Sequence, residues 1–326
     1  MINHFAIAEK GAFSLNEYRG KHTSSVPWAV SSTASSNYRS RHTLKNRRRR
    51  RMLIAFAVFL ALVLAYPFLE ALIIRVDRIS LVSNDLPADI GHLRVVYLTD
   101  IHYGFFFSDG RVNALVNQLN SLKPDLVLFG GDSGDDPSAA ISFYQQLPSI
   151  HARYAIAGVL GESDHGKDDL ERTLVTDAMR NAGVTPLINE VLPVRIGTSI
   201  IYVAGLDDVL SGRPDLASIA SRVSMEDYVI LLSHNPSVIP DAQRLPDRNN
   251  RLGWFDLALF GHTHGGQIRG LEALLDIGGD VNSRYQSGLL TENRSNLLIS
   301  NGVGSSVIPA RLFCPPQVHC IDISLP

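Results

Sequence analysis

This chain has few cysteines and a small net charge. Its 326 residues include only two cysteines, Cys314 and Cys320, and the formal net charge at pH 7 is −2. Two cysteines do not make a disulfide framework, and this spacing is not a zinc-ligand spacing, so both are predicted to be buried or idle thiols. So small a charge predicts no nucleic-acid partner for the whole chain. Hydrophobic residues (45%) and charged residues (19%) occur in proportions typical of a globular protein with a sizeable core.

The first 51 residues differ in composition from the rest. Residues 1–45 are rich in Ser, Asn, Thr and Arg and show no sustained periodicity. A dense basic run, Lys45-Asn-Arg-Arg-Arg-Arg-Arg51, follows directly. Segments of this kind bury too little apolar surface to offset the entropy of folding. We therefore predict a disordered, basic tail over residues 1–51.

An apolar stretch comes next. From Met52 to Leu69 there is no charged residue, and after Glu70 the apolar run resumes as Ala71-Leu-Ile-Ile74. About 20 apolar residues cross the hydrocarbon core of a bilayer. A soluble core helix would show a polar face, and a cleaved signal peptide would have a shorter basic region and a cleavage site of small residues. We predict a transmembrane or membrane-anchor helix over 52–74, with membrane lipid as a partner.

The orientation of this helix stays open between two alternatives. The arginine run before it favours a cytoplasmic N-terminus and a single span that exports the remaining domain. However, Arg75 and Arg78 flank its other end, and Pro67 and Glu70 interrupt it. An interfacial hairpin or half-inserted helix that leaves the domain in the cytoplasm is the alternative.

The rest of the chain, residues 78–326, alternates strand-like and helix-like segments. Short apolar runs predict buried strands, and apolar residues at helical spacing predict the helices between them, which indicates parallel pairing with crossover helices. The expected strands lie at 79–82, 93–99, 125–129, 153–160, 191–196, 199–204, 228–233, 255–260, 296–300 and 317–324. The expected helices lie at 111–122, 138–147, 168–181 and 215–223.

Aspartate and histidine follow four of these predicted strands. Asp100 and His102 follow the first, and Asp132 comes after the next within Gly130-Gly-Asp-Ser-Gly134. The other two strands lead to His234 and to Gly261-His-Thr-His264. Ligands of open α/β sheets gather beyond the carboxyl ends of the strands, so these side chains are expected in one place.

Carboxylate and imidazole groups without thiolates suit Mn²⁺, Fe, Zn²⁺ or Mg²⁺ and argue against a structural zinc site. Two ions roughly 3.5–4 Å apart would share a bridging carboxylate and clamp a phosphoryl group during displacement. The pattern thus predicts a site for two divalent metal ions, with Mn²⁺ as the first choice.

The order Asp-X-His, Gly-Asp, Gly-X-X-Asp, His and Gly-His-X-His resembles that of the calcineurin-like metallophosphoesterases, over about residues 78–326. Other stretches, such as Ala204-Gly-Leu-Asp-Asp208 and Pro309-Ala-Arg-Leu-Phe313, are similar to the membrane-associated bacterial branch. The resemblance implies an α/β fold of two face-to-face mixed β-sheets flanked by helices, in four αββα layers. It also implies that Asp100, His102 and His264 hold the first metal, that Asp132 bridges with a catalytic role, and that His234 and His262 hold the second.

One segment departs from the family pattern. Gly161-Glu-Ser-Asp-His165 stands where the family has Gly-Asn-His-Asp/Glu. Glu162 would replace the Asn ligand of the second metal, and Ser163 replaces a histidine that faces the substrate. Serine is a poor proton donor, and His165, two positions on, is the candidate to fill that catalytic role. Either the enzyme is tuned to a good leaving group, or its catalysis is weakened.

We therefore expect a metal-dependent hydrolase of a phosphodiester or pyrophosphate at the bacterial inner membrane. Relatives in that branch include the UDP-2,3-diacylglucosamine pyrophosphatases of lipid A synthesis, so this lipid-linked pyrophosphate is the expected substrate. A broad phosphodiesterase and a catalytically weakened metal-binding membrane protein are the alternatives. The sequence does not predict an oligomeric state.

Overall fold

The computed structural model describes residues 33–271 and 281–326, and the chain divides into two compact units, residues 1–59 and 60–326. The first helix, α1, runs from Thr33 to Glu70 and contains Pro67. Its part from Leu44 to Glu70 is long and apolar enough to cross a membrane. The helix therefore covers residues 33–51, where a disordered tail was expected; residues 1–32 lie outside the described residues.

α1 begins earlier and ends earlier than the helix expected over residues 52–74. Arg, Lys, Leu and Met are strong helix formers, so the helix extends through the basic run once the apolar segment has nucleated it. At its other end, α1 stops at Glu70 rather than at Ile74. The Glu70 carboxylate accepts hydrogen bonds from the backbone N–H groups of Phe313 and Cys314, which ties the helix end to another segment.

The globular domain contains two six-stranded mixed sheets. Sheet I has the order β1-β12-β2-β3-β4-β5, in which β2 to β5 are parallel, β12 is antiparallel to β2, and β1 is parallel to β12. Its strands are β1 Arg75–Val82, β2 His92–Leu98, β3 Leu126–Phe129, β4 Ala155–Gly158, β5 Thr185–Pro186 and β12 Gln317–Ser324.

Sheet II has the order β10-β11-β9-β8-β7-β6, with a parallel centre from β11 to β7 and one antiparallel strand at each edge. Its strands are β6 Glu190–Ile196, β7 Ser199–Gly205, β8 Val229–Leu232, β9 Leu257–Phe260, β10 Gly288–Glu292 and β11 Ser295–Ile299.

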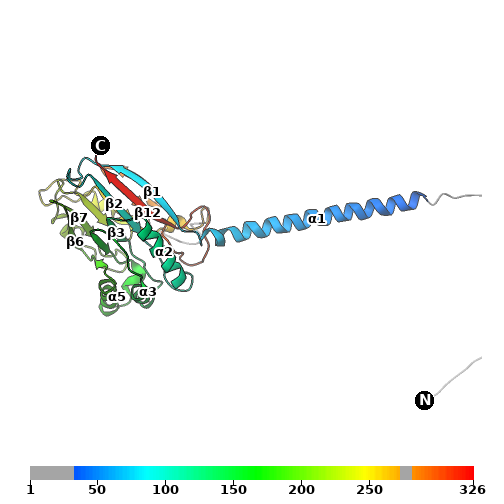
Figure 1. Cartoon of the computed structure of the whole chain (residues 1–326), viewed down its shortest axis with the longest axis horizontal. Helices are drawn as coiled ribbons and strands as arrows, with labels where there is room; N and C mark the ends of the chain where they lie inside the picture. The colour runs from blue at the N-terminus through cyan, green and yellow to red at the C-terminus, as the bar shows by residue number, and fades with distance from the viewer. Residues whose placement is uncertain (1–32, 272–280) are drawn as a thin grey trace, which may run out of the picture. The chain divides into compact units, whose positions relative to one another are not determined.

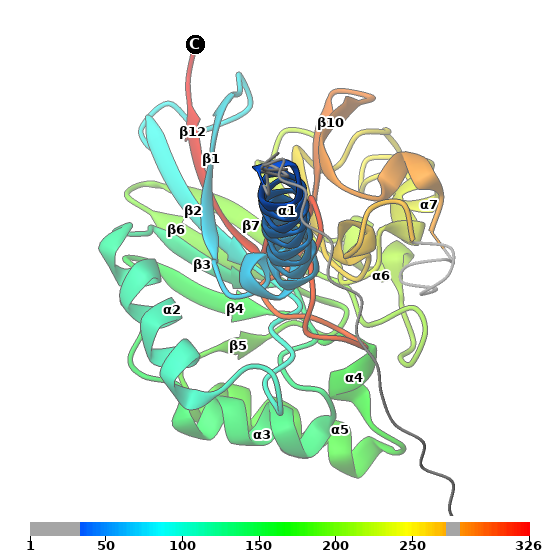
Figure 2. The same cartoon turned by 90° about the vertical axis from the view of Figure 1, so that its right-hand side faces the viewer.

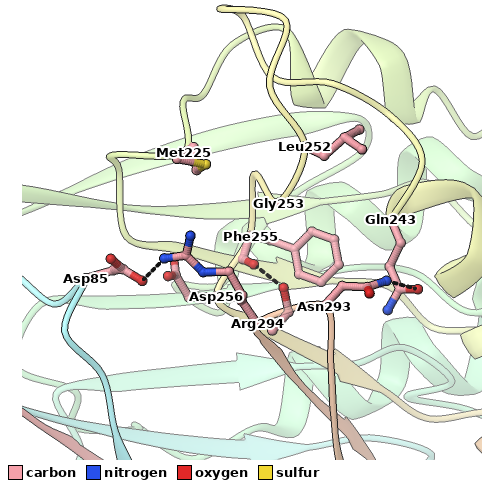
Figure 3. Close-up of a pocket in the computed structure, with 10 residues that line it drawn as sticks. Asp85, Met225, Gln243, Leu252, Gly253, Phe255, Asp256, Asn293 and Arg294 are labelled. Atoms are coloured by element: carbon pink, nitrogen blue, oxygen red, sulfur yellow. Dashed lines mark hydrogen bonds and ion pairs between the residues drawn. The ribbon is translucent and has the colours of Figure 1, made fainter.

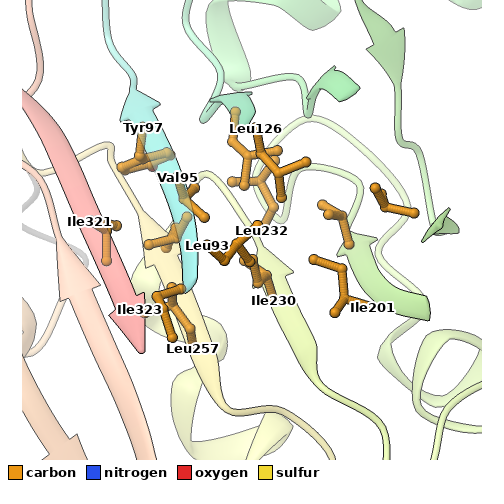
Figure 4. Packing of buried hydrophobic residues seen from close by; sticks show 14 of the residues in the cluster. Leu93, Val95, Tyr97, Leu126, Ile201, Ile230, Leu232, Leu257, Ile321 and Ile323 are labelled. Carbon is orange, nitrogen blue, oxygen red and sulfur yellow. The ribbon is translucent and has the colours of Figure 1, made fainter. Parts of the chain in front are cut away.

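Three apolar clusters separate the layers. The inner faces of both sheets share one cluster, in which Val95 and Tyr97 of β2 pack with Ile230 and Leu232 of β8 (Figure 4). Val96, the β2 residue between them, points to the opposite face, because successive strand side chains alternate. That outer face is covered by helices, as is the outer face of sheet II. The predicted four-layer αββα fold is confirmed.

The helices lie on the outer sides of the two sheets (Figures 1 and 2). Sheet I carries α2 Asp109–Ser121, α3 Pro137–Gln146 and α5 Asp169–Asn181, and sheet II carries α6 Leu216–Ala220 and α7 Ile239–Ala242. Shorter turns are α4 Glu162–His165, η1 Pro236–Val238, η2 His264–Gly266 and η3 Ser283–Tyr285.

Most predicted elements are present, with ends shifted by a few residues. The prediction omitted the short β5, α4 and α7, and it omitted β10. β10 forms a hairpin with β11 through Asn293 and Arg294, whose φ angles of 47° and 75° are those of a tight hairpin turn. Arg-containing turns of this kind lack the Asn-Gly signal that marks hairpins in a sequence.

The end of α1 and the carboxyl ends of the central strands of sheet I lie at the same end of that sheet. β1 begins at Arg75, directly opposite Gln317 at the start of β12. β12 runs antiparallel to β2, so that its beginning lies beside the end of β2, with His319 opposite Tyr97. The chain therefore leaves α1 at the edge where Asp100 and His102 follow β2.

Candidate metal centre

The predicted ligands follow four strand ends in sharply turned backbone. Asp100 and His102 follow β2, Asp132 follows β3, His234 follows β8, and His262 and His264 follow β9. All but His234 have positive φ angles, between 47° and 67°. Such left-handed conformations cost non-glycine residues roughly 1–3 kcal/mol each and accumulate at functional sites. This strained backbone aims the side chains of both sheets at one another.

Glycine makes the close approach possible. A Cβ added at Gly261 would lie 2.3 Å from Oδ2 of Asp100. Gly302 has a φ of 75°, and a Cβ there would lie 2.7 Å from the Cβ of Asp100. Asp100 is therefore seated between two backbone segments that tolerate no side chain at these positions.

Asp100, His102 and His264 form the first group of possible ligands, and all three are buried. The Nε2 atoms of His102 and His264 face each other at 3.1 Å, and Nε2 of His264 lies 3.5 Å from Oδ1 of Asp100. On the far side of the His102 ring, Nδ1 lies 3.3 Å from Oδ1 of Asp135. A carboxylate there holds the proton on Nδ1 and leaves Nε2 as a lone-pair donor, which is the usual support of a metal-binding histidine.

Asp100, Asp132 and His234 form the second group, also buried. Oδ2 of Asp132 lies 3.3 Å from Nε2 of His234 and 3.7 Å from Nε2 of His102, so this carboxylate stands between the two groups. Nδ1 of His234 bonds the carbonyl oxygen of Gly130 at 2.9 Å. Its Nε2 is buried without a hydrogen-bond partner. An orphaned ring nitrogen facing two carboxylates fits a metal ion.

The charges in the site favour ionised carboxylates and a neutral histidine. Burial alone would raise the pKa of Asp132, but His234 and His102 hold that pKa far below its usual range. Burial, His102 and the Arg311 guanidinium hold the pKa of His264 well below its ordinary value. A metal ligand must be deprotonated, so the pKa shifts of Asp132 and His264 suit ligation. Against burial, Asp135 raises the pKa of His102 and Asp132 raises the pKa of His234, so each of these rings holds a proton that a bound metal ion would displace. The two Asp/His groups are consistent with a binuclear divalent site.

Glu162 and His262 belong to neither of these groups, but both lie next to members of the second group. The backbone N–H of His262 donates to Oδ1 of Asp100 at 2.9 Å, and its ring packs edge-on against that of His234, with centroids 5.3 Å apart. Glu162 begins α4, and partial desolvation together with the charge of Asp132 raises its pKa. The ligand roles of these two residues stay predictions.

His165 is buried and bonded to another acid. Its Nε2 lies 2.7 Å from Oδ1 of Asp207, which is equally buried. Ser163 reaches the site through its backbone, whose N–H donates to Oδ1 of Asp132 at 2.9 Å. The catalytic role of His165 remains a prediction, and the pair with Asp207 was not expected. α4 and the loop after β7 line a polar cavity of about 330 Å³, with Lys167, Arg172 and Arg213 on its wall.

Asp208 is a residue that the sequence prediction did not place in the metal centre. It follows β7, which pairs in parallel with β8, so it lies at the sheet edge that carries His234. Oδ2 accepts hydrogen bonds from the backbone N–H groups of Leu210 and Ser211, while Oδ1 is buried without a partner. Against burial, the charges of Asp132, Asp100 and Asp208, in decreasing order, raise the pKa of His234. Its position after an apolar strand is the same signal that marked Asp100 and Asp132.

A second overlooked feature supports His264 from behind. Arg311 is fully buried, and its Nη2 lies 3.2 Å from Nδ1 of His264 while its Nε donates to the carbonyl of Gly304. The thiol of Cys314 contacts the carbonyl oxygen of His264 at 3.0 Å. Glu70 and the Pro67 carbonyl accept from the backbone of residues 311–314. We call this set of contacts between the last turn of α1 and residues 311–314 the helix clamp.

A cavity of about 360 Å³ lies at the other end of the sheets, where β9 and β11 begin (Figure 3). Asp85, Asp256 and Arg294 are among its lining residues, and Arg294 Nη2 lies 3.9 Å from Oδ2 of Asp85. Burial and the neighbouring Asp85 raise the pKa of Asp256 to about 7 against the hydrogen bond from the Val229 backbone. The cavity contains none of the predicted ligands.

Residues 93–266 match the family model "Calcineurin-like phosphoesterase". The chain is 26% identical over 261 residues to the uncharacterized metallophosphoesterase YkuE of Bacillus subtilis, covering 77% of this chain and 86% of that protein. It is 27% identical over 234 residues to the phosphodiesterase YaeI of Escherichia coli, covering 71% and 82% respectively.

Two further matches are more partial. A transmembrane protein with a metallophosphoesterase domain from Danio rerio is 26% identical over 261 residues, which cover 75% of this chain and 56% of that protein. Among solved structures, a phosphopantetheinyl hydrolase from Mycobacterium tuberculosis aligns with a TM-score of 0.39 at 13% identity, covering 66% of this chain and 90% of that one.

Proposed function

The chain belongs to the calcineurin-like phosphoesterases and is a metal-dependent phosphoesterase, and on this premise we propose that it is a membrane-anchored hydrolase of a lipid-linked phosphodiester or pyrophosphate. The observation that carries the hydrolase assignment is the pair of buried Asp/His groups with Asp132 between them. Among lipid-linked pyrophosphates, UDP-2,3-diacylglucosamine is the substrate we propose, and Mn²⁺ is the metal we propose first. The proposed location is a bacterial inner membrane.

Each residue of the centre has a defined part in this proposal. Asp100, His102 and His264 would hold one ion, Asp132 would bridge, and His234, His262 and Glu162 would hold the other. Two bound divalent ions supply a hydroxide at neutral pH and neutralise phosphoryl oxygens. Asp135 and the Gly130 carbonyl keep the protons of His102 and His234 on Nδ1, which leaves both Nε2 atoms for ligation.

The departures at 162–165 favour a substrate with a good leaving group. Ser163 uses its backbone N–H to hold Asp132, and its hydroxyl is a weak acid. A nucleotide leaving from a pyrophosphate needs less protonation than an alkoxide does, so this proton donor matters less. The cavity beside α4 also has Asp168 and Asp169 on its wall, and Arg172 pairs with Asp169 at 2.9 Å. Lys167 and Arg213 are therefore the cations that this cavity offers to the phosphate of such a leaving group.

The apolar helix supports the membrane part of the proposal. Its 27 residues from Leu44 to Glu70 suffice to span a bilayer, and none of its most apolar window is buried. The relative from Danio rerio is named as a transmembrane protein with a metallophosphoesterase domain, which supports this part of the proposal.

The test compares two substrates on the full-length protein in detergent, with Mn²⁺, Mg²⁺ or a chelator. We expect metal-dependent release of UMP from UDP-2,3-diacylglucosamine and slower cleavage of bis-(p-nitrophenyl) phosphate. Asp132→Asn should lower turnover by more than about 100-fold, since even the outer supports of metal ligands contribute 10–100-fold. Asp177→Asn, a surface substitution of the same kind on α5, serves as the control.

The outcomes separate the proposal from its rivals. Equal cleavage of the simple ester with and without detergent, and none of the lipid, would indicate a broad phosphodiesterase. Tight metal binding without turnover of either compound would favour a metal-binding membrane protein, the alternative that Glu162 and Ser163 keep open. Full activity of Asp132→Asn would refute the hydrolase site itself.

A further inference from the structure

Large apolar side chains are exposed where α1 joins the globular domain. Phe105 is 92% exposed, far more than a packed aromatic side chain. Four more exposed apolar residues lie on the same segments or on those bonded to them. We define the apolar rim as Leu72, Ile73, Phe105, Phe106 and Phe313.

Hydrogen bonds gather these residues from three distant segments. Arg111 donates from Nη2 to the carbonyl of Ala71 and from Nη1 to the carbonyl of Phe106, both at 3.0 Å. The same guanidinium lies over the ring of Phe107, 4.3 Å from its centroid. Arg111 therefore holds the residues after α1 against the loop that follows His102. The helix clamp holds Phe313 there through its backbone bond to Glu70.

The rim begins two residues after α1, whose last turns expose Phe68 and Leu69. Single exposed apolar residues are ordinary on soluble proteins, but a cluster adjoining a membrane-type helix indicates a membrane surface. Exposed Arg75 and Arg78 follow at once in β1. Basic residues close to a bilayer are attracted to anionic lipid headgroups. This sequence of apolar helix, apolar rim and exposed arginine is the one a bilayer interface requires.

The rim shares its loops with the metal centre. Phe105 and Phe106 come three and four residues after His102, and on the other side Phe313 follows Arg311 by two residues. Arg311 in turn contacts His264. Any surface that receives the rim therefore lies next to the loops that carry the first group of ligands.

We propose that the apolar rim inserts into the interface of the bilayer that holds α1, so that the metal centre takes phosphoesters of lipids at the level of their headgroups. This inference rests on the proposed membrane anchor and specifies how the domain meets its substrate. Phe105 and Phe106 lie in the bilayer interface, and Phe313 enters it from the opposite segment.

The test places tryptophan at rim positions of the full-length protein in vesicles of phosphatidylcholine and phosphatidylglycerol with brominated acyl chains. We expect bromine to quench the added fluorescence of Phe105→Trp and of Phe313→Trp. Phe59→Trp reports the anchor itself. Leu252→Trp is the matched control, because Leu252 is exposed but lies before β9, at the other end of the sheet. Cleavage of bis-(p-nitrophenyl) phosphate at the parental rate verifies that each variant is folded.

Quenching at both rim positions without quenching at Leu252→Trp would support the inference. Quenching at Phe59→Trp alone would refute insertion of the rim into the bilayer but would still support α1 as the membrane anchor. Absence of quenching at all positions would overturn the anchor and the rim together, and ester cleavage in the same samples would show that the hydrolase assignment is unaffected.

Discussion

The helix clamp allows a quantitative test of how the end of α1 supports the metal centre. Glu70 is buried and accepts backbone hydrogen bonds from Cys314 at 3.0 Å and from Phe313 at 3.2 Å. Hydrogen bonds to a charged group contribute about 1.5–3 kcal/mol each. Glu70→Gln keeps one carbonyl oxygen but turns an NH₂ group toward the other N–H donor. One charged bond becomes neutral and the other is lost, which should cost the folded state about 2–4 kcal/mol.

This loss should reach the metal through Arg311 and Cys314, which both contact His264. Weakening such outer supports typically lowers metal affinity by about 10–100-fold. We therefore expect Glu70→Gln to weaken Mn²⁺ binding by at least about tenfold in the full-length protein, measured by titration against a fluorescent chelator. The matched control is Asp177→Asn, which also removes one negative charge but from an exposed pair with Arg180.

The two readouts can contradict the reasoning separately. If Glu70→Gln lowers the melting temperature while Mn²⁺ binds as tightly as before, the clamp stabilises the fold without positioning His264. If Asp177→Asn weakens Mn²⁺ binding equally, the effect is one of net charge rather than of the clamp.

Three further predictions concern other parts of the domain. In the folded state the pKa of Asp256 is raised from 3.8 to about 7, so between these pH values the folded state binds a proton that the unfolded state has released, and stability falls as pH rises. Asp256→Asn should therefore make the melting temperature less dependent on pH between 5 and 7.5. An unchanged pH dependence would contradict this. Asp208→Asn should weaken binding of the second Mn²⁺ by about tenfold, because the substitution removes the negative charge of a buried carboxylate whose Oδ1 has no hydrogen-bond partner. Electron paramagnetic resonance of coupled Mn²⁺ pairs would measure the loss of the second ion. His165→Asn should slow hydrolysis of esters with poor leaving groups by about 10²-fold or more, while hydrolysis of p-nitrophenyl esters keeps its rate. If the substitution changes the rates of both classes of ester by the same factor, His165 does not act as the proton donor.

The sequence predicts the core of the site because strand ends are local signals. An apolar run followed by Asp or His identifies Asp100, Asp132 and His234 without knowledge of tertiary structure, and parallel pairing then brings the strand ends together. The same reasoning locates most strands of both sheets, since the buried strands are short and apolar, whereas the arrangement in two face-to-face sheets was implied by the family resemblance. Parallel sheets covered on both faces require such runs.

The parts that escaped prediction depend on distant partners. In the sequence, Glu70 only interrupts an apolar helix, and its bonds to residues more than 240 positions away give it a structural role. His165 was chosen for its proximity to Ser163, whereas its position is set by Asp207 on a loop from the other sheet. Nothing local in the sequence indicates that Arg311 is buried, whereas the folded chain places it behind His264.

The pairing of β1 also determines the order in which the domain can be completed during synthesis. β1 is the edge strand of sheet I, and its hydrogen-bonded neighbour β12 lies 242 residues further along the chain. At 5–20 residues per second, a ribosome needs roughly 10–50 s to produce that neighbour after β1 has emerged. During this interval β1 and the β12-facing edge of β2 present unpaired backbone, the kind of edge that associates with other chains. A chain that lost β12 would keep both of these strand edges unpaired.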